Sequence, residues 1–148
     1  MNRLLRQLHL FEEIFSAFQA AFPDDPLTVQ AMPIDETFVT LAPEHIHEAC
    51  EILVERFDFY HLSTITGLDT GAAVELFYHF WNAYGITLRT ALPYTALRIA
   101  TLTDFIPGAA FYERELYTML GVVFEGHVNL QPLLQPDDWD GSHPLRKT

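Results

Sequence analysis

The feature that most limits the possible folds is a block of three runs rich in β-branched and aromatic residues in the middle of the chain. The runs cover residues 57–66, 73–81 and 86–92, and the turn-forming segments 69–71 and 82–85 separate them. Runs of this composition, bounded by turn signals, are typical of strands joined as hairpins. We therefore predict three consecutive antiparallel strands.

Helical patterns lie on both sides of this block. Apolar residues recur at three- and four-residue spacing over residues 4–22, which predicts an amphipathic helix that ends at Pro23. A proline at a first helical position, followed by periodic apolar residues, predicts a second helix over residues 43–57. A third helix is predicted over residues 110–120, closed by Gly121 in the left-handed conformation.

Two shorter strands are predicted at residues 27–31 and 37–41, so the fold class is α+β: a small, mainly antiparallel sheet with helices packed on it. A length of 148 residues fits one domain. The prolines, glycine and aspartates near the C-terminus leave little room for regular elements. We therefore expect a core of residues 1–121 and an extended C-terminal docking arm of residues 122–148 within that single domain.

Charge and cysteine content exclude several classes of function. Eight basic and twenty acidic residues give a formal charge of −12, so nucleic acid is not an expected partner. The single cysteine, Cys50, cannot supply the thiolates of a zinc site or an iron-sulfur cluster, and its helical context predicts a buried position. The chain has no apolar stretch long enough for a membrane span and no signal peptide, which predicts a cytoplasmic protein.

The third helix begins with the charged triplet Glu113-Arg114-Glu115. Adjacent helical positions point about 100 degrees apart, so the two carboxylates do not share one site. A paired-acid catalyst is therefore disfavoured. We expect the acids to stabilise the start of the helix and Arg114 to bridge to a neighbouring carboxylate or carbonyl.

His127 and His143 flank the last segment, and we expect each to fix a turn through a hydrogen bond from a ring nitrogen. Two alternatives stay open at this point. One is a free regulatory binding module. The other is a small metal-dependent hydrolase in which both histidines and nearby carboxylates hold a metal ion. The candidate carboxylates are those of Asp137, Asp138 and Asp140.

Three ordered motifs, at residues 102–115, 121–127 and 143–147, carry a family resemblance. In them the chain resembles the thirty-kilodalton subunit, also called the C subunit, of complex I NADH-quinone oxidoreductase. The same family includes the related accessory subunit of membrane-bound, energy-converting nickel–iron hydrogenases. The resemblance is looser back to Phe57 and fades in the N-terminal third.

The resemblance implies a non-catalytic accessory or scaffold subunit that carries no cofactor of its own. Its arm would dock on the large subunit that holds the quinone or nickel–iron site, beside an iron-sulfur subunit, on the cytoplasmic side of a membrane complex. The iron-sulfur clusters would belong to the partner subunits. The residues that match the family pattern and are expected at the partner interface are Glu113, Arg114, Glu115, Gly121, Phe124, Gly126, His127, Leu130, His143, Pro144, Leu145, Arg146 and Lys147.

The chain departs from the family pattern at Thr118, Asn129, Gln131 and Ser142. Where Gln131 stands, the family usually has an arginine. A less basic arm changes which carboxylates of a partner it can pair with. These departures favour the hydrogenase-like branch over the NADH-linked branch.

Overall fold

The computed structural model describes residues 3–32, 36–127 and 143–146. Two single turns of 3-10 helix, η1 (Pro43–His45) and η2 (Tyr94–Ala96), accompany the longer elements. In chain order, the helices and strands of these residues are α1 (Arg3–Ala21), β1 (Thr28–Met32), β2 (Glu36–Thr40), α2 (Ile46–Phe57), β3 (His61–Asp69), β4 (Val74–Asn82), β5 (Tyr84–Leu92), β6 (Arg98–Ala100), α3 (Ala109–Leu120) and β7 (Val123–Glu125).

The main sheet has the strand order β1-β2-β5-β4-β3. Strands β3, β4 and β5 form the predicted antiparallel series, and β1 pairs antiparallel with β2. Strand β2, however, runs parallel to β5, with Val39 opposite Leu88. The sheet is therefore mixed but mainly antiparallel, and the predicted α+β class is confirmed.

Strand β3 begins later than predicted, at His61 and not at residue 57. Asp58 closes α2 in the left-handed conformation (φ 61°), with its backbone N–H bonded to the carbonyl of Leu53. A left-handed residue interrupts both helix and strand, so the extended run starts only beyond it. Strand β3 ends at Asp69, whose carboxylate accepts the backbone N–H of Gly71 in the following turn.

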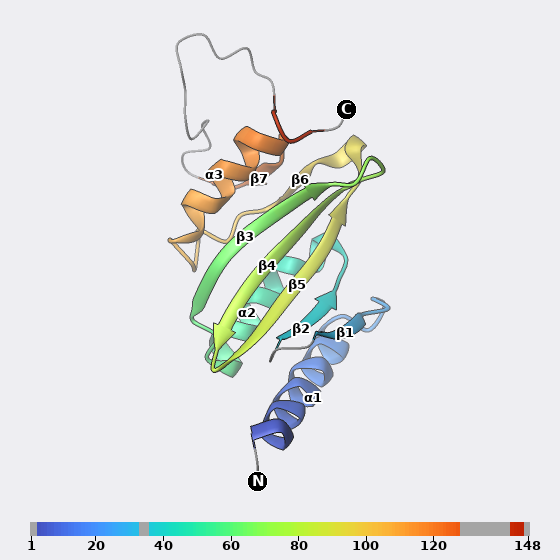
Figure 1. Ribbon diagram of the computed structural model, residues 1–148, viewed down its shortest axis with the longest axis vertical. Coiled ribbons are helices and arrows are strands. Elements are labelled where there is room, and N and C mark those ends of the chain that lie inside the picture. The colour runs from blue at the N-terminus through green and yellow to red at the C-terminus, as the bar shows by residue number, and fades with distance from the viewer. Residues whose placement is uncertain (1–2, 33–35, 128–142, 147–148) are drawn as a thin grey trace.

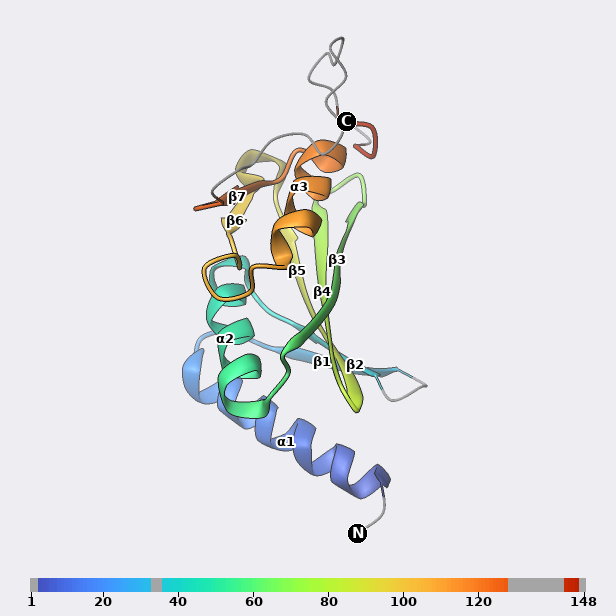
Figure 2. The ribbon, with the colours of Figure 1, turned by 90° about the vertical axis from the view of Figure 1, so that its left-hand side faces the viewer.

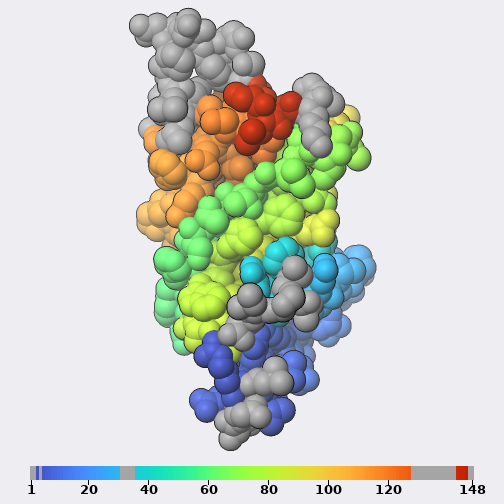
Figure 3. All heavy atoms as spheres, viewed as in Figure 1, coloured from blue at the N-terminus to red at the C-terminus, as the bar shows by residue number. Residues whose placement is uncertain are grey.

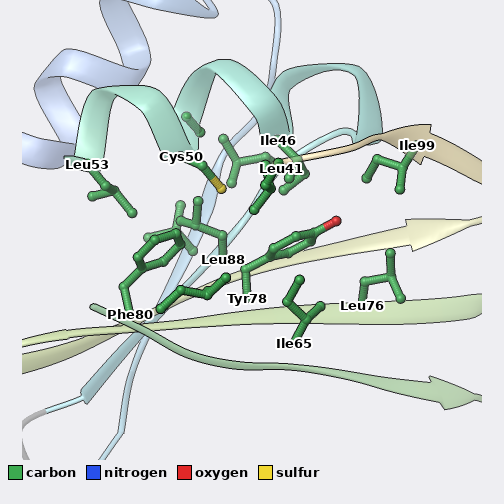
Figure 4. Close-up of a cluster of buried hydrophobic side chains, with 14 of the residues drawn as sticks. Leu41, Ile46, Cys50, Leu53, Ile65, Leu76, Tyr78, Phe80, Leu88 and Ile99 are labelled. Carbon is green, nitrogen blue, oxygen red and sulfur yellow. The ribbon is translucent and has the colours of Figure 1, made fainter. Parts of the chain in front are cut away.

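Among the residues described, the helices lie on one face of the main sheet, and the other face is not covered by a helix (Figures 1 and 2). Between α2 and the sheet lies the hydrophobic core, where Cys50 faces Tyr78 and Leu88 (Figure 4). All three residues are 0% exposed. The prediction that Cys50 is buried on a helix face is confirmed, and burial raises the pKa of its thiol well above the ordinary value.

A second, two-stranded sheet joins β6 to β7 in parallel, with α3 as the connection between them. Sequence patterns did not predict this pairing. Val122 and Phe124 are 0% and 1% exposed and belong to the core cluster. The first residues of the predicted arm are therefore part of the folded core, because the apolar side chains next to and within β7 are buried there.

Helix α3 packs closely on β3, and Gly67 permits this contact. A Cβ atom at Gly67 would lie 2.5 Å from Cδ1 of Leu120 and 2.9 Å from Cδ2 of Leu116, both on α3. Real Cβ atoms essentially never lie this close, so a side chain at position 67 would force the buried leucines of α3 to shift. Glycine therefore lets α3 pack closely on β3 without that rearrangement.

Candidate functional site

The first acid of the charged triplet, Glu113, lies inside the domain with 0% exposure. Its carboxylate accepts hydrogen bonds from Oγ1 of Thr101 at 2.6 Å and from the backbone N–H of Leu102 at 2.8 Å. Burial raises the pKa of Glu113 above the ordinary glutamate value, and these hydrogen bonds oppose the shift. Glu113 thus connects the loop before α3 to the helix. Because it is buried, it can influence the protein surface only by holding Thr101 and Leu102 in place.

His127 lies at the other end of the same cluster, and its side chain is 1% exposed. Its Nε2 donates to the carbonyl of Ala110 at 3.2 Å and is 4.0 Å from Oε1 of Glu113. The backbone N–H of His127 bonds to the carbonyl of Phe124, across Gly126 in the left-handed conformation (φ 91°). The predicted hydrogen bond from a ring nitrogen of His127 is present, but it fixes the chain after β7 to the first turn of α3, and the turn itself is closed by the backbone.

Residues 143–146, which we call the strap, lie at the C-terminal end of α3, opposite to the end that His127 contacts. Nδ1 of His143 donates to the carbonyl of Thr118 at 2.9 Å, and the N–H of Leu145 donates to the carbonyl of Met119 at 2.8 Å. The prediction that His143 bonds through a ring nitrogen is confirmed. In Figure 3 the strap, in red, lies across α3 and the strands beside it.

Gly121 makes room for the strap. It closes α3 in the left-handed conformation (φ 78°), as predicted from the sequence. A Cβ atom here would lie 3.0 Å from Cδ2 of His143 and 3.3 Å from a guanidinium nitrogen of Arg146. Both the backbone conformation and the packing of the strap therefore favour glycine.

Arg146 connects the strap to β3, α3 and η2. Its Nε lies 3.5 Å from Oδ2 of Asp69, whose side chain is 0% exposed, and NH1 donates to the carbonyl of Leu120 at 3.2 Å. The guanidinium lies 5.2 Å from the ring centroid of Tyr94. The hydroxyl of Tyr94 in turn donates to Asp69. The strap is thus held by a buried carboxylate far away in the sequence.

The sequence assigned this bridging role to Arg114, and the structure assigns it to Arg146. Within residues 3–32, 36–127 and 143–146, the Arg114 side chain makes no hydrogen bond or ion pair, whereas Arg146 donates to the carbonyl of Leu120 and pairs with Asp69. The pairing of Asp69 with Arg146 could not be predicted from the sequence, because an aspartate after a strand is typical of an ordinary turn. Its role depends on a contact between the hairpin and the C-terminal segment, which no local pattern contains.

Leu145 of the strap and Glu115 of α3 lie together on the surface. Both line a hollow of about 390 Å³ between β3 and α3. Leu145 is 57% exposed, and Glu115 is half-buried. Phe124, by contrast, is 1% exposed and supports the fold from inside. Leu130 and Lys147 lie outside the described residues, and Pro144 is part of the strap.

The alternative metal site does not assemble among the described residues. His127 and His143 bond to opposite ends of α3, and no group of three potential ligands occurs in the part of the chain that the structure describes. Asp137, Asp138 and Asp140 lie outside those residues. His47, at the start of α2, hydrogen-bonds to the carboxylate of Asp104 at 2.9 Å.

Comparison with known proteins identifies the family. Residues 39–148 match the family described as the 30 kDa subunit of respiratory-chain NADH dehydrogenase. The chain belongs to this family. The match includes the loop before α3, the helix itself and the strap. The N-terminal α1 and β1 lie outside it, in the third of the sequence where the motifs fade.

Relatives of this 30 kDa subunit family include the C subunit of NADH-quinone oxidoreductase from Salinispora arenicola. It is 32% identical over 150 residues, which cover 93% of this chain and 60% of the relative. The chain thus spans 60% of the length of that protein. The C/D subunit of NADH-quinone oxidoreductase from Cronobacter sakazakii is also 32% identical, with 94% of this chain and 25% of the relative covered.

A solved structure of the membrane-bound sulfane sulfur reductase, an archaeal respiratory membrane complex, contains a chain of the same fold. The TM-score is 0.78 at 26% identity, and the match covers 92% of this chain and 83% of the other. The family therefore contributes subunits to multi-subunit respiratory complexes. No helix in the described part of this chain combines the length and apolarity needed to cross a bilayer.

Proposed function

We propose that this chain is a non-catalytic accessory subunit in the peripheral arm of a complex-I-type oxidoreductase or an energy-converting hydrogenase. It docks on the large subunit through its C-terminal segment and sits on the cytoplasmic side of the membrane. The observation that carries the proposal is the family match over residues 39–148. It is joined to a C-terminal strap that hydrogen bonds and an ion pair hold to α3 and β3, with Leu145 exposed.

The names of the relatives support the large subunit as the partner. In the C/D subunit of Cronobacter sakazakii, the part that matches this chain covers 25% of a longer protein whose name joins the two subunits. A fused pair keeps its two parts in one assembly, which favours a direct contact between the corresponding separate chains. A neighbouring iron-sulfur subunit is the second partner that we propose.

In this proposal the chain supports the position of the large subunit and carries out no redox chemistry itself. Its one cysteine, Cys50, is 0% exposed behind the sheet and has no second thiol to join it in holding a cluster. Iron-sulfur clusters and the quinone or nickel–iron site belong to the partner subunits. The choice between the NADH-linked and the hydrogenase-like branch stays a prediction.

The proposed interface is the surface built around the strap. Leu145 and Glu115 meet the partner directly, whereas Glu113, Phe124 and His127 hold the surface in shape from within. A preorganised strap costs less conformational entropy on docking than a free arm does. The remaining residues that we propose for the interface are Arg114, Gly121, Gly126, His143, Pro144 and Arg146. Two more, Leu130 and Lys147, are proposed from the sequence alone.

A matched pair of substitutions tests this function in the assembled complex. Leu145→Asp places a charge in the proposed interface, and Val29→Asp places one on β1, where Val29 is 48% exposed. With a tag on the large subunit, we expect the first variant to co-purify poorly and the second to co-purify like the wild type. Thermal unfolding of each variant checks that its fold is intact. A catalytically intact complex that lacks this chain would overturn the proposal.

A further inference from the structure

The hollow between β3 and α3 combines an apolar wall with a single acid. The wall is formed by Ile65, Gly67, Leu116, Met119 and Leu145, and Thr66 and Glu115 complete the lining. The Thr66 hydroxyl is already hydrogen-bonded to His79. Among the described residues, none makes a hydrogen bond or an ion pair with the Glu115 side chain. The hollow thus offers an apolar surface beside a half-buried carboxylate that pairs with no cation in the described part of the chain.

An apolar wall beside a carboxylate that is unpaired among the described residues favours an occupant that has both an apolar part and a positive charge. A purely apolar side chain would remove water from the carboxylate and leave it unpaired, which is costly. An arginine side chain satisfies both parts, because its aliphatic stem packs on apolar surface while its guanidinium pairs with the carboxylate. A formal charge of −12 on the whole chain also favours a basic partner segment.

The position of the hollow connects it to the strap. Leu145 belongs both to the strap and to the lining of the hollow, and Met119 accepts the backbone hydrogen bond that holds Leu145 in place. The surface of the strap and the hollow are therefore continuous. A partner that covers Leu145 also reaches Glu115.

We propose that this hollow receives an arginine side chain of the large subunit, with its stem against Leu116, Met119 and Leu145 and its guanidinium on Glu115. The inference rests on the proposed function and names the contact that anchors the docked surface. Anchoring residues of this kind, at a pocket lined by apolar side chains, carry much of the affinity of protein interfaces. Methionine in the wall suits the flexible arginine stem because its side chain adapts its shape.

The test uses the full-length chain and the purified large subunit from the same complex. Glu115→Gln keeps the size of the side chain and removes its charge, whereas Glu55→Gln removes a charge on the exposed part of α2. We expect the first variant to bind about tenfold more weakly, a ratio that corresponds to roughly 1.4 kcal/mol. Its affinity should also depend less on salt than that of the wild type. The Glu55 variant should bind like the wild type.

A photo-crosslinker at Met119 then identifies the occupant. The expected product is a crosslink to an arginine-containing peptide of the large subunit, and replacing that arginine by glutamate should weaken binding to the wild type but restore binding to Glu115→Arg. A crosslink to a peptide without arginine, or to a second copy of this chain, would overturn the inference. Unchanged affinity of Glu115→Gln together with weak binding of Leu145→Asp would overturn it too, while the docking function would stand. Failure of the wild-type chain to bind the large subunit would instead refute the proposed function.

Discussion

Substitution of Arg146 by methionine is the most direct probe of the strap, because methionine keeps an unbranched apolar stem and removes the guanidinium. Breaking a buried ion pair from one side costs about 3 to 5 kcal/mol when both charges are fully enclosed. Here the Arg146 side chain is 19% exposed, and Asp69 keeps hydrogen bonds from Gly71 and Tyr94. We therefore expect the free energy of unfolding to fall by about 2 to 3 kcal/mol.

Chemical unfolding followed by circular dichroism measures this change, and in a thermal scan it corresponds to roughly 5 to 10 °C for a chain of this length. Arg98→Met, at an exposed position on β6, is the matched control and should change stability by less than about 0.5 kcal/mol. Asp69→Asn and the double variant complete a thermodynamic cycle. Equal effects of Arg146→Met and Arg98→Met, or additive effects of the substitutions at Asp69 and Arg146, would refute the reasoning.

Three further predictions concern the fold of the domain. Gly67→Ala should destabilise the protein by about 1 to 3 kcal/mol in urea unfolding, because its Cβ would overlap with Leu120, whereas Gly108→Ala, with open space around it, should change little. Burial raises the pKa of Glu113, so the stability that this residue contributes at low pH should be lost as the pH rises through the raised folded pKa. Glu113→Gln should remove this dependence of the free energy of unfolding on pH. The same pH dependence in the variant and the wild type would contradict the assignment. Asp25, between α1 and β1, accepts hydrogen bonds from the backbone N–H groups of Leu27 and Ala42 and lies 2.7 Å from Nδ1 of His45. Burial alone would raise the pKa of Asp25, but these hydrogen bonds outweigh burial and lower it. Asp25→Asn should therefore cost about 1 to 2 kcal/mol at neutral pH and converge with the wild type as the pH falls through the lowered folded pKa; a difference that persists in stronger acid would contradict this.

The elements with strong local signals could be predicted from the sequence. Apolar periodicity predicted α1, and the left-handed Gly121 at the end of α3 followed from the known preference of helix ends for glycine. The strand series from β3 to β5 followed from β-branched and aromatic runs. In each case the residues that decide the structure are neighbours in the chain.

The missed features depend on contacts between distant segments. The parallel pairing of β6 with β7 joins Ile99 to Phe124 across the whole of α3, and short apolar runs alone do not reveal a partner. Glu113 looked like a surface acid at a helix start, whereas it is buried and accepts hydrogen bonds from Thr101 and Leu102, twelve and eleven residues earlier in the chain. The same limit explains why the bridging role was predicted for Arg114 and not for Arg146.

The parallel pairing of β2 with β5 has a consequence for synthesis on the ribosome. Strands β1 and β2 emerge early and can form their hairpin at once, but the other side of β2 must wait until residues 85–89 of β5 have emerged from the ribosome. Until then, β2 presents an unpaired edge that other nascent chains can use as a template. Translational pauses before these residues emerge should therefore promote aggregation, whereas pauses after they have emerged should not.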